Sequence, residues 1–234
     1  QNELMSFAIV RDDIPLYSVD AGIMLQDDIG YLKINRFAAT TYDEMMEKVD
    51  FLQKEGMQKL ILDLRGNPGG YLHIASQICD EFLKTRELIV FTEGRNRNKQ
   101  ETFATQNGSL ENIKVIALIN EGSASAAEIV SGALQDNDRG LIIGRKSFGK
   151  GLVQEQITLN DGSVMRLTTQ RYYTPSGRCI QKDYGKNTKD YYLEQYTRSD
   201  TSTYHPDSLK YTTKKGRTVY GGGGITPDII IERD

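Results

Sequence analysis

The segment KLILDLRGNPGG (residues 59–70) joins a short apolar run to a loop of glycine, proline and polar residues. The run KLILDL (59–64) has the length and composition of a strand that is buried on both faces of a sheet. The loop RGNPGG (65–70) leads into a helix that we expect over about residues 71–84. A strand, a glycine-rich turn and a helix in this order predict one unit of an α/β fold.

A similar arrangement precedes this segment. YLKINRF (31–37) alternates between apolar and polar residues as a strand does. Thr41 and Glu44 then fit a capping box, in which a hydroxyl and a carboxylate each accept a free backbone N–H, and apolar residues recur at helical spacing over 45–52. Gly56 is typical of the residue that ends a helix. The sequence therefore predicts a strand and a helix before residue 59.

More elements of both kinds follow. We expect strands over 87–92, 114–120 and 141–144 and a helix over about 125–136. Two alternating segments, 152–159 and 163–173, then flank Asn160-Asp161-Gly162, which is a strong signal for a β-hairpin. The alternation across 31–144 predicts right-handed crossovers and a largely parallel sheet with flanking helices. The hairpin adds an antiparallel element, so the fold class is α/β.

The composition excludes several classes of function. The 234 residues include 29 Lys and Arg against 32 Asp and Glu, a net charge of −3, whereas a dedicated nucleic-acid binder carries a basic excess. No run approaches the roughly 18 apolar residues of a membrane span. Two histidines and two widely separated cysteines, Cys79 and Cys179, give neither a disulfide framework nor the ligand spacing of a metal site. We therefore expect no nucleic-acid partner, no metal and no cofactor.

Residues 182–217 differ from the rest of the chain. Tyr, Lys, Asp, Thr and Ser dominate there, and Leu193 and Leu209 are the only aliphatic residues. A stretch of this kind contributes little to a core, so it is either a polar excursion that lies over the body or a disordered segment. A glycine run over 221–224, which we expect to be flexible, precedes a last strand.

Three loops follow predicted parallel strands, where open α/β sheets bind their ligands. They are Arg65–Gly70, Glu121–Ser125 and Arg145–Gly151. Each is rich in glycine or other small residues, so its backbone can approach a ligand closely. The three loops together are the candidate site.

Ser125 has two interpretations. With Glu128 it fits a capping box at the start of the helix over 125–136. Alternatively it is a nucleophile at a strand-to-helix turn, where the backbone N–H groups that begin a helix can stabilise an oxyanion. Ser123 competes with it for the second role on local grounds.

Lys150 also has more than one interpretation. Residues 144–150 match the G-x-x-x-x-G-K pattern of a phosphate-binding loop, but Gly151 stands where that loop needs Ser or Thr, and a strand follows instead of a helix. An NTPase is therefore disfavoured. A solvated surface lysine is the ordinary interpretation. His73 and His205 lie in neighbourhoods that do not indicate catalysis, so a base for Ser125 would be a lysine.

Five segments in order resemble the carboxyl-terminal processing peptidases, also called tail-specific proteases. They are Asp63–Gly70, Gly122–Ile129, Ser147–Gln154, YYTPSGR (172–178) and GGGGITPDI (221–229). The resemblance runs from about residue 10 to the end of the sequence. It implies a serine endopeptidase that hydrolyses peptide bonds near the C-termini of protein substrates, with a crotonase-like core of the kind found in ClpP-type proteases.

The resemblance also assigns roles to residues. It implies that Ser125 rather than Ser123 is the nucleophile, that Lys150 is the general base, and that Gln154 supports the base. Four positions along an extended segment return a side chain to the same face, so we expect Lys150 and Gln154 to meet. An oxyanion hole is implied from the backbone N–H of Ala126 and of a glycine in the loop 65–70.

Of the two glycines that could complete the oxyanion hole, we expect Gly69, with Gly70 as the alternative. The resemblance further implies a PDZ domain before the core, so we expect residues 1–15 to be a remnant of its end and residues 16–234 to be the catalytic core. It implies protein or peptide substrates bound through their C-terminal region, with a homo-oligomer or an adaptor protein as further partners. It also implies an exported protein of the periplasm or cell envelope.

Overall fold

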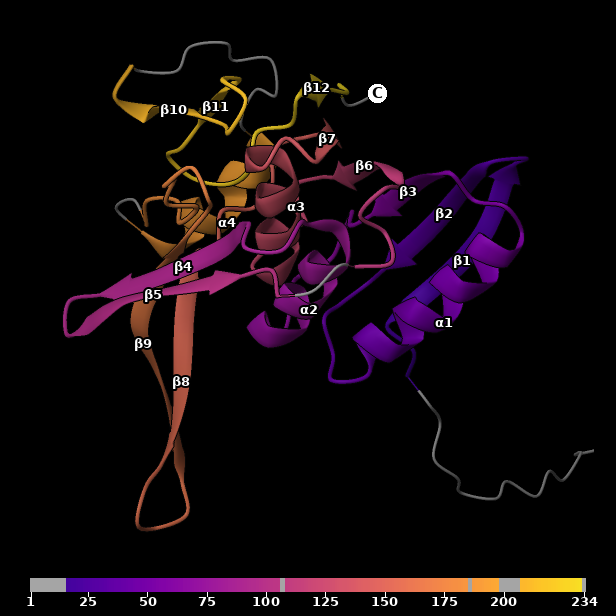
Figure 1. Cartoon of the computed structure of the whole chain (residues 1–234). Coiled ribbons are helices and arrows are strands. Elements are labelled where there is room, and N and C mark those ends of the chain that lie inside the picture. The colour runs from indigo at the N-terminus through magenta and orange to yellow at the C-terminus, as the bar shows by residue number, and fades with distance from the viewer. Residues whose placement is uncertain (1–15, 106–107, 185–186, 198–206, 233–234) are drawn as a thin grey trace, which may run out of the picture.

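The computed structural model describes residues 16–105, 108–184, 187–197 and 207–232 (Figure 1). In these ranges the largest sheet has six strands, of which β1 is antiparallel to β2 and the others are parallel to their neighbours. Their order across the sheet is β1 (Val19–Gln26), β2 (Ile29–Ile34), β3 (Lys59–Asp63), β6 (Lys114–Ile119), β7 (Gly140–Gly144) and β12 (Ile229–Ile230). The predicted largely parallel sheet is confirmed.

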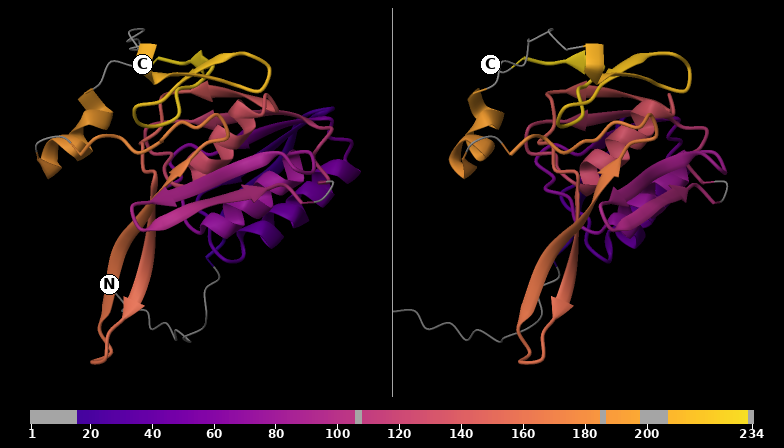
Figure 2. Two further views of the ribbon diagram at one scale, coloured as in Figure 1. Left: turned by 60° about the vertical axis from the view of Figure 1, so that its left-hand side comes forward. Right: turned by 90° about the vertical axis from the view of Figure 1, so that its left-hand side faces the viewer.

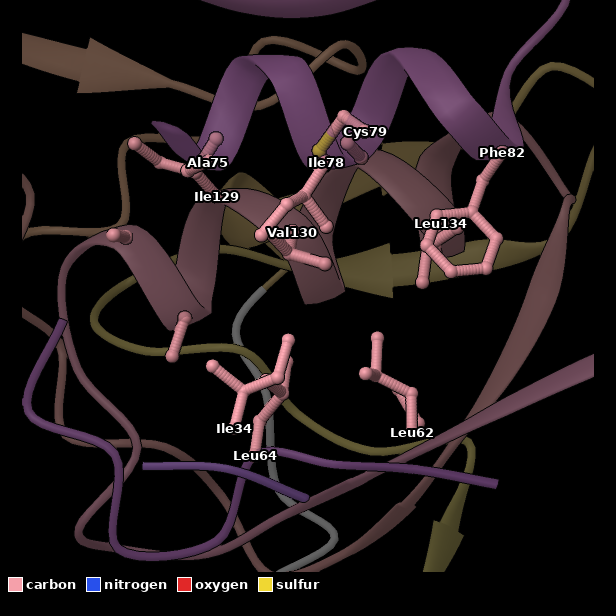
Figure 3. Packing of buried hydrophobic residues seen from close by; sticks show 14 of the residues in the cluster. Ile34, Leu62, Leu64, Ala75, Ile78, Cys79, Phe82, Ile129, Val130 and Leu134 are labelled. Atoms are coloured by element: carbon pink, nitrogen blue, oxygen red, sulfur yellow. The ribbon is translucent and has the colours of Figure 1, made fainter. Parts of the chain in front are cut away.

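Three helices share an apolar core with this sheet: α1 (Thr41–Lys54), α2 (Leu72–Phe82) and α3 (Ala126–Asp136). Of these, α1 and α3 pack on its strands, and α2 packs on α3. The helix predicted over 71–84 and the helix predicted over 125–136 are therefore both present. Figure 3 shows the layers, with Ile78 and Phe82 of α2 next to Val130 and Leu134 of α3, and with Leu62 of β3 on the other side of α3. All five side chains belong to one buried apolar cluster.

The prediction that residues 59–64 are buried on both faces is wrong. Leu60 and Leu62 are buried in the apolar cluster that the three helices share, whereas Ile61, which points to the other face, is only partly buried. On β7 of the same sheet, Ile142 is likewise buried and Leu141 is 43% exposed. The burial alternates because the helices that connect the parallel strands cover one face of the sheet.

A second sheet contains antiparallel strands in the order β5-β4-β9-β8. These strands are β4 (Leu88–Gly94), β5 (Arg97–Phe103), β8 (Leu152–Thr158) and β9 (Val164–Tyr173). The predicted hairpin is confirmed as β8 and β9, which extend away from the body of the molecule (Figures 1 and 2). We expected residues 87–92 to join the parallel sheet, but they pair with β5, a polar strand that the sequence did not indicate.

The polar segment 182–217 has regular structure where it is described: α4 (Thr188–Thr197), a 3-10 turn η1 (Asp207–Leu209) and β10 (Lys210–Thr212), which pairs with β11 (Thr218–Tyr220). Arg178, just before this segment, is buried and forms an ion pair with Asp136 of α3 at 2.5 Å. The segment is therefore anchored to the core at its start.

The glycine run that we expected to be flexible packs tightly. Gly224 has φ of 74°, and its N–H donates to the Ile180 carbonyl at 2.8 Å. A β-carbon at this position would lie 2.6 Å from the carbonyl oxygen of Ser147. Glycine is required because the C-terminal segment passes this close to the loop that precedes Lys150.

The predicted capping box of α1 is wrong. The helix begins at Thr41 and its N-cap is Thr40, so Thr41 and Glu44 do not cap each other. The Glu44 carboxylate instead accepts the Thr40 hydroxyl at 2.6 Å and the Ser18 N–H at 2.7 Å. Glu44 thus ties α1 to the chain that enters β1.

In the part of the chain that the structure describes, no helix is both long enough and apolar enough to cross a membrane. The described residues also contain no group of three or more His, Cys, Asp or Glu side chains that could hold a metal ion. The expected PDZ remnant at residues 1–15 and His205 lie outside the described residues.

Candidate active site

Five of the six predicted site residues line one hollow of about 600 Å³, between the parallel sheet and the second sheet. They are Gly69, Gly70, Ser125, Lys150 and Gln154. The sixth, Ala126, is buried at the first position of α3. The loops that follow β3, β6 and β7 supply Gly69, Gly70, Ser125 and Lys150, and Gln154 comes from strand β8 (Leu152–Thr158). The carboxyl ends of three parallel strands therefore position most of the site.

Ser125 lies at the sharp turn between β6 and α3. Its backbone has φ of 55° and ψ of −113°, a conformation that costs roughly 1–3 kcal/mol for a residue with a side chain. Ser125 is partly exposed, whereas Ser123 is fully buried and its hydroxyl donates to the Leu64 carbonyl at 2.8 Å. Ser125 is thus the serine of the pair that lines the hollow.

The buried carboxylate of Glu128 connects the loops of the site. Its Oε2 accepts the backbone N–H of Ser125 and the backbone N–H of Lys150, each at 2.8 Å. Its Oε1 accepts the Gly149 N–H at 2.7 Å and the Ser147 hydroxyl at 2.5 Å. Burial raises the pKa of the Glu128 carboxyl, while these four donors favour its ionised form.

Glu128 relates the two interpretations of Ser125. The bond from the Ser125 N–H to Glu128 is half of the predicted capping box. The same carboxylate reaches across to the loop of Lys150, which a helix cap does not require. The helix cap and the candidate catalytic residues therefore share one group.

Lys150 lies in the loop between β7 and β8, and no ion pair involves it among the residues that the structure describes. Tyr172, at the end of β9, donates its hydroxyl to the Lys150 carbonyl oxygen. Burial raises the pKa of Tyr172 well above its usual value, and the neighbouring Ser125 side chain acts in the opposite direction. Tyr172 is 1% exposed and lines the hollow together with both candidate catalytic residues.

Gln154 shares the hollow with Lys150, but its amide donates weakly to the Thr168 hydroxyl, at 3.5 Å. We expected alternation along an extended segment to bring the two side chains together. The segment is not regular, because Lys150 precedes β8 and a register shift lies between Val153 and Gln154. The support of Lys150 by Gln154 stays a prediction.

The two candidate glycines of the oxyanion hole differ in their hydrogen bonds. The Gly69 N–H donates to Asn67 Oδ1 at 2.8 Å. The Gly70 N–H has no acceptor among the described residues, and neither has that of Ala126. Gly69 has φ of 96°, and a β-carbon there would lie 2.6 Å from that of Ser125. Gly69 therefore permits the close approach of the two loops, and Gly70 has the free donor.

An ion pair fixes the start of the loop 65–70. Asp63, at the end of β3, accepts the Arg65 side chain at 2.6 Å and the Tyr31 hydroxyl at 2.7 Å. Burial raises the pKa of a carboxyl, but these hydrogen bonds outweigh burial and lower the pKa of Asp63 to about 2. The loop that carries Gly69 and Gly70 thus begins at an anchored position.

Sequence reasoning did not assign roles to Glu128 or Tyr172. For Glu128 a signal existed, since it stands three positions after Ser125, but only the capping role was considered. Tyr172 stands in the segment 172–178 that resembles the family, but its contact with Lys150 depends on how β9 folds back and could not be derived from that segment.

The hollow thus brings together a serine on a strained strand-to-helix turn, a lysine and a backbone N–H without an acceptor among the described residues. Residues 28–193 match the model of peptidase family S41, and the chain belongs to this family. The chain is also similar to curated relatives. It is 44% identical over 182 residues to a carboxy-terminal-processing protease of Bartonella bacilliformis, covering 76% of this chain and 41% of that protein.

It is 36% identical over 178 residues to the carboxy-terminal processing protease CtpA of Bacillus subtilis, covering 76% of this chain and 38% of that protein. Among solved structures, the photosystem II D1 C-terminal processing protease matches with a TM-score of 0.65 and 26% identity, covering 87% of this chain and 42% of that one. This chain therefore spans about two fifths of the length of these relatives.

Proposed function

We propose that the protein is a serine endopeptidase that hydrolyses peptide bonds near the C-termini of protein substrates. The observation that carries the proposal is the pairing of Ser125 and Lys150 in one hollow, with both backbones bound to the same oxygen of Glu128. The names of the relatives support the position of the cut.

In the proposed reaction, neutral Lys150 accepts the hydroxyl proton of Ser125 while Oγ attacks the carbonyl carbon of the scissile bond. The C–N bond then breaks, and Lys150 returns the proton to the leaving amine. Lys150 then takes a proton from a water molecule, whose oxygen attacks the acyl carbon of the ester. The bond from that carbon to Ser125 Oγ breaks, and Lys150 returns the proton to Oγ, which regenerates the enzyme. Each half-reaction begins and ends with the same number of protons on Lys150.

For the oxyanion hole, we propose the backbone N–H groups of Ala126 and Gly70. The N–H of Ala126 is at the N-terminus of α3, where the helix dipole also favours negative charge. We expected Gly69 from the sequence, with Gly70 as the alternative. We now propose Gly70 as the second donor, because the Gly69 N–H is already bound to Asn67. An oxyanion donor has to be free before the reaction begins.

The substrate is proposed to bind as an extended strand beside β8. This strand is at the edge of the second sheet, and Leu152, Val153 and Gln154 at its start line the hollow. A peptide that pairs with a sheet edge is bound mainly through its backbone, so a cleavable segment has to be unfolded. Gln154 would then orient Lys150 or the substrate.

Two experiments test the proposal. In the first, the protein reacts with a fluorophosphonate probe and the labelled residue is identified. In the second, the protein is incubated with unfolded proteins and the sites of cleavage are mapped. Label on Ser125, and cuts that disappear in Ser125→Ala, support the proposal. If the protein binds unfolded chains but neither reacts with the probe nor cleaves them, it is a peptide-binding homologue, and the proposed function is overturned.

A further inference from the structure

A second hollow of about 660 Å³ adjoins the candidate active site. It shares Pro68, Lys150, Leu152 and Gln154 with the first hollow, so the two adjoin at the candidate base. A peptide that lies across Ser125 in extended form advances by about 3.3 Å per residue. Side chains close to the scissile bond therefore reach the second hollow.

Aromatic residues line one side of this hollow. They are Phe148, Tyr184, Tyr191 and Tyr192, which we call the aromatic wall. The Tyr184 and Tyr191 rings stack at 5.1 Å, and Tyr191 meets Tyr192 edge-on at 5.2 Å. Tyr191 is 9% exposed, but Tyr184 and Tyr192 are 53% and 56% exposed. The wall thus presents two large rings at the mouth of the hollow.

Lys182 holds the aromatic wall against the loop of Lys150. Its ammonium lies 4.3 Å from the centre of the Phe148 ring and 4.2 Å from that of the Tyr191 ring. It donates to the Tyr191 carbonyl at 2.6 Å, and the Lys182 backbone N–H donates to the Gly149 carbonyl at 3.0 Å. The Lys182 ammonium also forms an ion pair with Glu194 at 3.0 Å, and the side chain does not line the hollow.

The facing side of the hollow is small and carries little net charge. Pro68, Gly122 and Ala124 leave room there. The one acidic lining residue, Glu121, forms an ion pair with Arg145 at 2.9 Å. Rings on one side, small residues on the other and a neutralised carboxylate favour a bulky apolar side chain over a charged one.

We propose that the second hollow is a substrate subsite, and that it binds an aromatic or other bulky apolar side chain of the peptide near the scissile bond. This inference rests on the proposed function. It assigns a role to the first part of the polar segment 182–217, since α4 supplies Tyr191 and Tyr192. Because Tyr191 and Tyr192 of α4 are proposed to select the substrate side chain, a change in α4 should alter substrate preference without altering the chemistry at Ser125.

The test uses a set of short peptides in which each position in turn carries Phe or Ala. We expect kcat/KM to be about ten- to a hundredfold higher with Phe at one position near the cut. Tyr192→Ala should reduce that ratio to near one, mainly through KM. Tyr17→Ala, which removes an exposed ring from the other end of the described chain, should leave the ratio unchanged.

Binding of the same labelled peptides to Ser125→Ala separates the two proposals. A Phe preference in binding that Tyr192→Ala removes supports the subsite even if no peptide is cut, and the proposed function then fails alone. Cleavage without a Phe preference at any position, or a preference that survives Tyr192→Ala, would overturn the subsite and leave the proposed function standing.

Discussion

The backbone N–H groups of Ser125 and Lys150, 25 positions apart in sequence, donate to the same carboxylate oxygen at the same distance of 2.8 Å. That oxygen belongs to Glu128, which is completely buried. A shared acceptor fixes the two backbones relative to each other before any substrate binds. Such preorganisation is what a nucleophile and its base require.

Glu128→Gln keeps the shape of this side chain but places an amide against N–H and O–H donors. We expect kcat to fall by at least about tenfold with little change in KM, because the variant misplaces Lys150 relative to Ser125. Glu81→Gln is the matched control. Glu81 is also buried and accepts bonds from Ser109 and Tyr42, but it lies away from the hollow. The Glu81→Gln variant should have a lower free energy of unfolding and an unchanged kcat. Equal losses of kcat in the two variants would contradict the prediction.

Ser125→Gly should abolish cleavage and stabilise the fold by about 1 kcal/mol, because glycine adopts a φ of 55° without strain. Urea denaturation measures the second effect. Ser123→Ala should instead retain cleavage and lower the free energy of unfolding, since it removes a buried hydrogen bond to Leu64 and leaves the nucleophile in place. If Ser123→Ala were inactive while folded and Ser125→Gly active, the assignment of the nucleophile would be wrong.

Lys150→Arg should have no measurable turnover. Guanidinium stays protonated at any pH where the protein is folded, so it cannot accept the Ser125 proton. Reaction with the fluorophosphonate probe should also be lost, while far-UV circular dichroism is unchanged. Lys59→Arg, a surface change at the start of β3, controls for arginine substitution itself. Turnover by Lys150→Arg would exclude Lys150 as the base.

Tyr172→Phe removes one hydroxyl and keeps the ring. We expect kcat to fall about tenfold with KM unchanged, because the Lys150 carbonyl loses a hydrogen-bond donor and the Ser125 side chain loses a polar neighbour. Tyr42→Phe removes another buried phenol bond, to Glu81, and should lower only the free energy of unfolding. A Tyr172→Phe enzyme with full kcat would limit the hydroxyl to a structural role.

Asp63→Asn should change how stability depends on pH. The folded pKa of Asp63, about 2, lies below the value of about 3.9 for an unfolded chain. The ionised form therefore contributes about 2 kcal/mol above pH 4, and this contribution is lost as the pH falls towards 2. Urea denaturation should show wild type more stable than the variant at pH 7, with a gap that narrows in acid.

Local pattern was sufficient for most of the parallel sheet and for the hairpin. Residues 59–63 and 114–119 are strands because their apolar runs are short and lie next to turn residues. Residues 88–94 have the same apolar character, yet they joined the second sheet. Their partner over 97–103 is polar and mostly exposed, so it carried no periodic signal, and the choice of sheet could not be derived.

In the candidate site, too, local sequence predicted some features and not others. Ser125 and Lys150 were found because they lie within motifs, and motifs are local. The contact of Tyr172 with Lys150 is set by the pairing of β8 with β9, and the contact of Gly224 with Ser147 by the path of the C-terminal segment. Relationships of this kind join residues far apart in the chain, and no periodicity encodes them.

Lys150 precedes a strand of the second sheet, whereas Ser125 follows a strand of the first, and this division bears on how a newly made copy behaves. An unfolded copy of the chain is itself a polypeptide of the class that the proposed enzyme cuts. In the proposed enzyme, the hollow that contains Ser125 and Lys150 is also lined by Gln154 of β8 and Tyr172 of β9. A copy whose second sheet has not docked would therefore lack part of the site, so cleavage by the proposed enzyme requires both sheets to be in place.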